Sequence, residues 1–164
     1  MIRLSKSSIG QKEKDAVAGV LAVSPGEYNH EIVAKLHGPK FKMLYKQAVS
    51  AMENGNGNEL IRPGYPWGSI WSTETFIEHF HVDNRYSVTK HAFNTVVPTL
   101  FVFGEEECRI GGEEELPVCG AAQRGLLESA YPHVVIKVVE GANHGYKGRV
   151  DEMACEVFTW LESL

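Results

Sequence analysis

The chain of 164 residues lacks several features that mark common functional classes. Its three cysteines, Cys108, Cys119 and Cys155, are odd in number and contain no Cys-x-x-Cys pair. Their spacing therefore predicts neither a disulfide framework nor a zinc site. The sequence also has no Gly-x-Gly-x-x-Gly fingerprint and no His-x-x-x-His pair, so it implies no nucleotide cofactor and no metal.

Excess positive charge and long apolar runs are absent as well. The formal net charge is −5 and the sequence pI is about 5.8, which argues against nucleic acid as a partner. No apolar run approaches the ~20 residues that cross a bilayer. The first residues, Met1–Lys6, lack the apolar segment of a signal peptide. We expect a soluble, cytoplasmic protein with no membrane partner.

What the chain does contain is three short, continuous apolar runs, each typical of a parallel strand that is covered on both faces. These runs are Ala16–Val23, Val96–Phe103 and Val134–Val139. A helix predicted over 121–131 connects the last two runs as a right-handed parallel crossover. The sequence therefore predicts an α/β fold.

Helical periodicity covers two further regions. Apolar residues recur at steps of three and four from Glu31 to Met52, where Gly38-Pro39 is expected to divide the span into two helices. The segment 53–58 is expected to end it with a C-cap and a turn. A terminal helix with one apolar face is predicted over 150–164. Between them, 63–94 is irregular and aromatic-rich, with a short helix that begins after the cap residue Ser72.

Two polar motifs follow neighbouring predicted strands. Gly104-Glu105-Glu106-Glu107 follows the strand over 96–103, and Gly141-Ala142-Asn143-His144-Gly145 follows the last strand. The carboxyl ends of parallel strands meet at one edge of the sheet, where function gathers. An acid and a histidine placed there can form a hydrogen bond that fixes the imidazole tautomer.

The pattern of Pro98–Glu107, then Gly141–Tyr146, then an amphipathic helix with Trp160-Leu161, resembles the α/β-hydrolase superfamily. The resemblance implies one domain over 1–164 with a partial α/β-hydrolase fold. Its short, mostly parallel sheet would have three to four strands flanked by helices. The domain would begin with a polar segment (1–15) and would contain a cap-like helical insertion (26–94) and C-terminal strand–helix units (95–164).

By the same resemblance, His144 would be the general base and Glu107 the acid of a Ser-His-acid mechanism, with Glu105 and Glu106 left open as alternatives. The substrate would be an ester, thioester or related acyl compound. Ring surfaces in a cap favour an apolar acyl or alcohol group. The expected substrate-binding residues are Ser24, Trp67, Trp71, Phe76 and Tyr146.

The nucleophile is the missing part of this pattern, because the sequence has no Gly-x-Ser-x-Gly elbow. The nearest match, Lys6-Ser7-Ser8-Ile9-Gly10, makes Ser8 the candidate. Six residues then precede Val17, and as a helix they span only about 9 Å. A parallel connection needs about a dozen residues, so a polar N-terminal segment is the preferred interpretation. Cys108 is no substitute, since the adjacent acids raise a thiol pKa.

Two functions stay open at this point. The first is a hydrolase present as its C-terminal portion. The alternative is a non-catalytic truncated homologue that binds a small molecule or associates with itself. An edge strand at Ala16–Val23 would invite pairing with another chain. We therefore expect a homodimer or association with a complementary chain.

Overall fold

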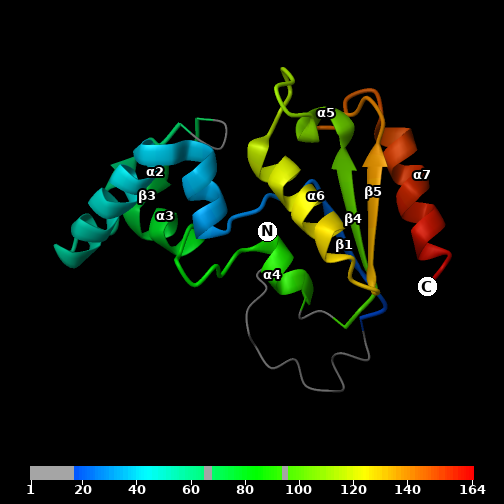
Figure 1. Cartoon of the computed structure of the whole chain (residues 1–164), viewed down its shortest axis with the longest axis horizontal. Helices are drawn as coiled ribbons and strands as arrows, with labels where there is room; N and C mark the ends of the chain where they lie inside the picture. Colours follow the sequence, from blue (N-terminus) through cyan, green and yellow to red (C-terminus); the bar gives the residue numbers. More distant parts are fainter. Residues whose placement is uncertain (1–16, 65–67, 94–95) are drawn as a thin grey trace. The chain divides into compact units, whose positions relative to one another are not determined.

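The computed structural model describes residues 17–64, 68–93 and 96–164 (Figure 1). The chain divides into two compact units. Unit 1 contains the described residues up to Gly26 together with Thr89–Leu164, and unit 2 is Glu27–Val88. Unit 2 thus follows the first strand in the sequence, over nearly the same span as the predicted insertion at 26–94.

Unit 1 is built on a parallel sheet in the order β1-β4-β5, which confirms the predicted α/β fold with a short parallel sheet flanked by helices. The strands are β1 (Val20–Val23), β4 (Thr99–Gly104) and β5 (Val134–Val139). All residues of the central strand β4 are buried. This burial explains why its sequence is apolar without alternation from Leu100 to Phe103.

Four helices accompany this sheet: α4 (Val88–Phe93), α5 (Glu105–Cys108), α6 (Pro117–Ser129) and α7 (Val150–Leu161). Helix α6 begins with Pro117, earlier than the predicted start at Ala121, because proline is favoured in the first helical turn. In Figure 1 it runs beside β4 and in front of β1. The predicted terminal helix is confirmed as α7.

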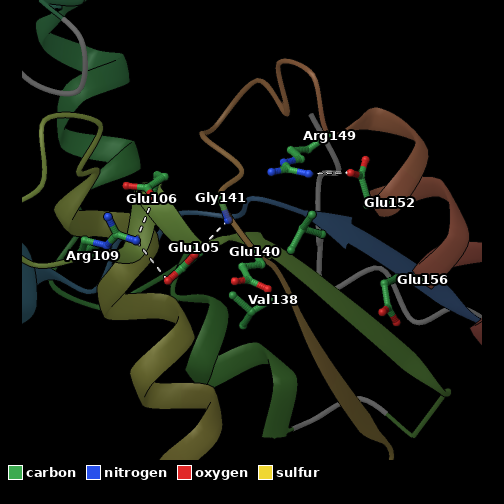
Figure 2. Close-up of a pocket in the computed structure, with 10 residues that line it drawn as sticks. Glu105, Glu106, Arg109, Val138, Glu140, Gly141, Arg149, Glu152 and Glu156 are labelled. Atoms are coloured by element: carbon green, nitrogen blue, oxygen red, sulfur yellow. Dashed lines mark hydrogen bonds and ion pairs between the residues drawn. The ribbon is translucent and has the colours of Figure 1, made fainter.

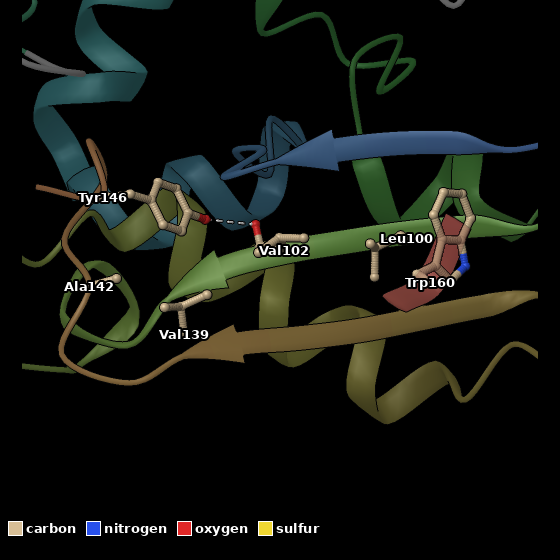
Figure 3. Packing of buried hydrophobic residues seen from close by; sticks show 6 residues of the cluster. All are labelled: Leu100, Val102, Val139, Ala142, Tyr146 and Trp160. Carbon is tan, nitrogen blue, oxygen red and sulfur yellow. Dashed lines mark hydrogen bonds between the residues drawn. The ribbon is translucent and has the colours of Figure 1, made fainter. Parts of the chain in front are cut away.

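One face of the sheet packs against α7. Trp160 of α7 joins Leu100, Val102 and Val139 in a buried apolar cluster (Figure 3). A Cβ atom at Gly19 would lie 2.6 Å from the indole of Trp160, so a larger residue here would force the side chains at the C-terminal end of the chain to move. The close approach ties the chain just before β1 to the end of α7.

The outer edge of β1 pairs with no other strand within the described part of the chain. Val20 and Ser24 donate their backbone N–H groups toward β4, to the carbonyl oxygens of Pro98 and Val102. In a parallel ladder alternate residues point the opposite way, so Leu21 and Val23 direct theirs outward. Their side chains are 36% and 42% exposed.

Unit 2 contains the long helical span α2 (His30–Glu53), the two-residue strands β2 (Leu60–Ile61) and β3 (Trp71–Ser72), and α3 (Thr73–His79). The predicted division at Gly38-Pro39 is confirmed, because Gly38 has φ 59° and breaks the helical geometry. Ser72 caps α3, as predicted, by accepting the N–H of Thr75. The antiparallel β2–β3 pair was not predicted.

Aromatic rings form the core of unit 2. Phe41, Phe76 and Phe80 are buried together with Val33 and Ala48. His79 lies at the side of this cluster, stacked on Tyr86 with ring centroids 5.0 Å apart. Its buried Nε2 has no hydrogen-bond partner among the described residues. Burial lowers the pKa of His79 to about 4.

None of the helices in the described ranges is both long and apolar enough to cross a membrane.

The buried His79 predicts that unit 2 loses folding stability in acid. A histidine in the unfolded chain titrates near 6.5, so the unfolded state binds more protons between about pH 6.5 and 4. Stability is therefore lost as the pH falls through that window, by at most about 2 kcal/mol at pH 5. We expect His79→Phe to remove this loss in urea denaturation at pH 7 and pH 5.

His91→Phe, which changes a histidine of α4 in unit 1, is the control and should keep the acid sensitivity of the wild type. An equal loss of stability in His79→Phe and in the wild type would contradict the prediction.

Candidate active site

Glu107 and His144 meet at the carboxyl end of the sheet. Nδ1 of His144 lies 2.7 Å from Oε2 of Glu107. The carboxylate side chain is wholly buried, whereas the imidazole side chain is 40% exposed. The two residues predicted to act together are therefore in hydrogen-bond contact, one in the interior and one at the surface.

Glu107 reaches this position because α5 begins directly at the end of β4. Its other oxygen, Oε1, accepts the backbone N–H of Gly104 at 2.7 Å, which is a capping-box interaction at the start of the helix. Gly104 itself must be glycine, because a Cβ there would lie 2.5 Å from the carbonyl oxygen of Ala142. The end of β4 and the histidine loop are thus in direct contact.

The histidine loop, residues 140–149, is held by its own turns and by α5. Asn143 Oδ1 accepts the N–H groups of Gly145 and Lys147, and the carbonyl oxygen of Ala142 accepts the N–H of Glu106 at 2.9 Å. Such side-chain to backbone bonds stabilise a turn without regular secondary structure. The imidazole is consequently placed by a fixed backbone.

These contacts distinguish the three consecutive glutamates. Glu105 accepts the N–H of Gly141 at 2.9 Å and pairs with Arg109, and Glu106 also pairs with Arg109. Only Glu107 turns inward, toward His144. Of the three acids that the sequence left open, Glu107 is the one in contact with the histidine.

Ser24 and Tyr146 complete a hydrogen-bond network around the carboxylate. Oγ of Ser24 donates to Oε1 of Glu107 at 2.6 Å and lies 3.0 Å from the hydroxyl of Tyr146. That hydroxyl donates to the carbonyl oxygen of Val102 at 3.1 Å. The serine proton goes to the carboxylate, the stronger acceptor, so the tyrosine proton is shared between Val102 and Ser24.

Both hydroxyl residues have left-handed backbones, with φ 46° at Ser24 and φ 51° at Tyr146. This conformation is uncommon for residues other than glycine and costs about 1 kcal/mol or more. Strain of this kind concentrates at functional sites. Ser24, predicted as a hydroxyl lining the pocket, and Tyr146, which is 4% exposed, both contact the acid network.

Burial keeps the phenol of Tyr146 and the thiols of Cys108 and Cys119 protonated at neutral pH. It raises the pKa of the Tyr146 phenol to about 12, and the charge of Glu107 adds to that increase while the Ser24 hydrogen bond opposes it. The pKa of Cys108 is raised to about 12 by burial first and by Glu107 second. The pKa of Cys119 is raised by the same causes. Neither buried thiol is a ready nucleophile.

Cys119, a residue that the sequence analysis assigned no role, lies beside this pair. Its Sγ is 4.0 Å from Nδ1 of His144 and 3.7 Å from the carbonyl oxygen of Ser24. One donor atom each from Glu107, Cys119 and His144 all lie within 4.8 Å of one another. The three residues come from α5, α6 and the histidine loop, so no sequence spacing could have revealed the cluster.

The remaining predicted site residues lie elsewhere or outside the described residues. Phe76 has no exposed surface and packs among the rings of unit 2, and its contact with a substrate stays a prediction. Trp71 is partly buried against the same cluster, and its indole donates to Ser69 Oγ at 2.9 Å. Ser8 and Trp67 lie outside the residues that the structure describes.

A hollow of about 700 Å³ on unit 1 does not include the His144–Glu107 pair (Figure 2). Charged side chains dominate its lining, which consists of Glu105, Glu106, Arg109, Val138, Val139, Glu140, Gly141, Arg149, Glu152 and Glu156. Arg109 pairs with Glu105 and Glu106, and Arg149 pairs with Glu152. Such a charged surface does not suit the apolar acyl group expected from the sequence.

The sequence matches no protein-family model, and neither a curated protein nor a solved structure matches the chain. These comparisons therefore assign no family to the chain.

The buried carboxylate predicts a large difference between two adjacent glutamates. Glu107→Ala removes the acceptor of three hydrogen bonds and leaves the Gly104 N–H without it. We expect this to lower the free energy of unfolding by about 2 kcal/mol or more. Glu106→Ala, the matched control on the same helix, removes only a partly exposed ion pair worth about 1 kcal/mol or less. Urea denaturation measures both, and equal losses would contradict the prediction.

Proposed function

We propose that the chain is the C-terminal portion of an α/β-hydrolase-type enzyme that cleaves an ester, thioester or related acyl substrate, with His144 as its general base. The observation that carries the proposal is the 2.7 Å contact between His144 Nδ1 and the buried carboxylate of Glu107. The two residues follow the adjacent parallel strands β4 and β5, where α/β folds gather their reactive groups.

The geometry suits a base. Because Glu107 accepts a hydrogen bond from Nδ1, the neutral imidazole carries its proton there and its basic lone pair lies on Nε2. Nε2 would take the proton of an attacking hydroxyl and then deliver it to the leaving group. Glu107 would stabilise the imidazolium between these steps. Positioned proton transfer of this kind contributes about 10²- to 10⁴-fold in rate.

Ser24 belongs to the hydrogen-bond network around Glu107 and His144, but it does not suit the role of nucleophile. Its hydroxyl donates to Glu107 rather than to His144, so the base does not receive its proton. In this proposal the attacking hydroxyl comes from outside the described residues. It belongs either to Ser8 or to a complementary chain.

The proposal predicts hydrolysis that depends on His144. With short p-nitrophenyl esters we expect His144→Gln to lower kcat/KM by at least about 100-fold. His133→Gln is the matched control, because His133 immediately precedes β5 and therefore lies at the opposite end of the same strand. Its activity should equal that of the wild type.

Labelling by a fluorophosphonate probe, followed by peptide mapping, identifies the nucleophile in the same preparations. Without turnover and without an adduct in the wild type, hydrolysis by this chain is excluded. An adduct on Ser24 would overturn the role that its hydrogen bond to Glu107 assigns to it.

A second candidate function, self-association, is favoured by the outer edge of β1. Leu21 and Val23 point their backbone groups outward and expose apolar side chains, and an uncovered apolar edge strand invites pairing. Two copies related by a twofold axis would place β1 antiparallel to its equivalent in the other copy. Such a pairing uses the same surface on both partners.

This candidate predicts a dimer that a single edge charge dissociates. Leu21→Lys places a charge on the pairing edge and should give a monomer in size-exclusion chromatography with light scattering. Ile110→Lys, at a residue that is 74% exposed and belongs to no strand, should leave the dimer intact. A wild-type monomer at high concentration, or dissociation by both variants alike, would count against pairing through β1.

A further inference from the structure

We propose that Glu107, Cys119 and His144 form a binding site for a thiophilic divalent cation, with Zn²⁺ as the ion that fits the donors best. One donor atom from each residue lies within 4.8 Å of the other two. The ligands would be a carboxylate oxygen, a thiolate sulfur and Nδ1 of the imidazole. Binding does not depend on the hydrolase function proposed above.

The distances are close to those of a tetrahedral zinc site. With Zn–S near 2.3 Å and Zn–N near 2.0 to 2.1 Å, the sulfur and nitrogen ligands lie about 3.5 Å apart and nitrogen and oxygen about 3.3 Å apart. In the structure the corresponding distances are 4.0 Å for Cys119–His144 and 2.7 Å for His144–Glu107. Side-chain movements of about half an ångström would bring these two distances to the tetrahedral values.

The donor types select the ion. A sulfur, an imidazole nitrogen and a single carboxylate fit Zn²⁺, whereas Ca²⁺ and Mg²⁺ prefer sets of oxygen ligands. Three protein ligands leave a fourth position for water or another small ligand. The charges also balance, because one thiolate and one carboxylate neutralise a divalent cation.

The surroundings provide a supporting shell and an entry path. Oε1 of Glu107 is held by Ser24 Oγ and the Gly104 N–H, so the ligand carboxylate is already oriented. Glu107 and Cys119 are buried, whereas the side chain of His144 is 40% exposed. The ion would enter beside the imidazole.

Binding requires a defined movement of protons. The Cys119 thiol loses its proton to solvent as the Zn–S bond forms. The imidazole stays neutral, and its single proton is transferred through solvent from Nδ1 to Nε2. The hydrogen bond from Nδ1 to Glu107 is therefore replaced by two bonds to the metal. A base with its lone pair on Nε2 and a metal bound at Nδ1 cannot exist together on one imidazole.

Cobalt(II) titration of the full chain tests the site without any measurement of activity. Co²⁺ replaces Zn²⁺ in tetrahedral sites, and a thiolate ligand gives a charge-transfer band in the near ultraviolet. We expect this band in the wild type, its displacement by Zn²⁺, and its loss in Cys119→Ser. Cys155→Ser, which changes the exposed thiol, and Cys108→Ala, which changes the other buried thiol, should keep the band.

His144→Gln provides an independent arm, because its partly exposed side chain can be changed with little disturbance of the core. We expect the dissociation constant for Zn²⁺ to rise at least about tenfold, measured by competition with a chromogenic chelator. Absence of the thiolate band in the wild type with excess Co²⁺ would overturn the proposal. Its persistence in Cys119→Ser, or its loss in Cys155→Ser or Cys108→Ala, would do the same.

Discussion

The buried carboxylate of Glu107 is the constraint on which the organisation of unit 1 depends. A charge removed from water is tolerated only where hydrogen bonds replace the lost hydration. Here the donors are Ser24 at the end of β1, Gly104 at the end of β4 and His144 after β5. A single side chain thus connects the carboxyl ends of all three strands in the sheet.

Several residues around this carboxylate have backbone features that lower stability or allow only glycine, and their contacts near the carboxylate account for these features. Ser24 and Tyr146 adopt left-handed backbones, and Gly104 leaves room for the carbonyl oxygen of Ala142. Each of these features brings a donor, or the loop that holds one, close to the carboxylate. The strain at Ser24 is offset by a 2.6 Å hydrogen bond to a charged acceptor, one of the stronger interactions available to a hydroxyl.

Elements whose formation depends on local chemistry were predictable from the sequence. The apolar runs became β1, β4 and β5, Gly38-Pro39 interrupts α2, and Ser72 caps α3. The β2–β3 pair was not predictable, because strands of two residues carry no periodicity and depend on tertiary contacts. The start of α6 at Pro117 follows the preference of proline for the first helical turn, a signal that the apolar periodicity of 121–131 does not contain.

Phe76 belongs to the buried core of unit 2. It lies in the aromatic-rich segment 63–94 of the predicted cap. Phe76 on α3 and Phe80, the C-cap residue of that helix, are four positions apart and face the same core. That spacing was a visible signal of burial. Cys119 gave no comparable signal, because its neighbours in space, Glu107 and His144, are distant in sequence and on other elements.

The difference in exposure between Glu107 and His144 explains why one site supports two proposals. A carboxylate that is wholly buried interacts strongly with whatever positive charge appears beside it, since water does not screen it. An imidazole that is 40% exposed can be reached from solvent. The positive charge could be a proton taken by the imidazole during acyl transfer or a cation that also binds Cys119. Both proposals use a buried acid beside an accessible histidine, and they differ in whether Nδ1 would carry its proton or bind the cation.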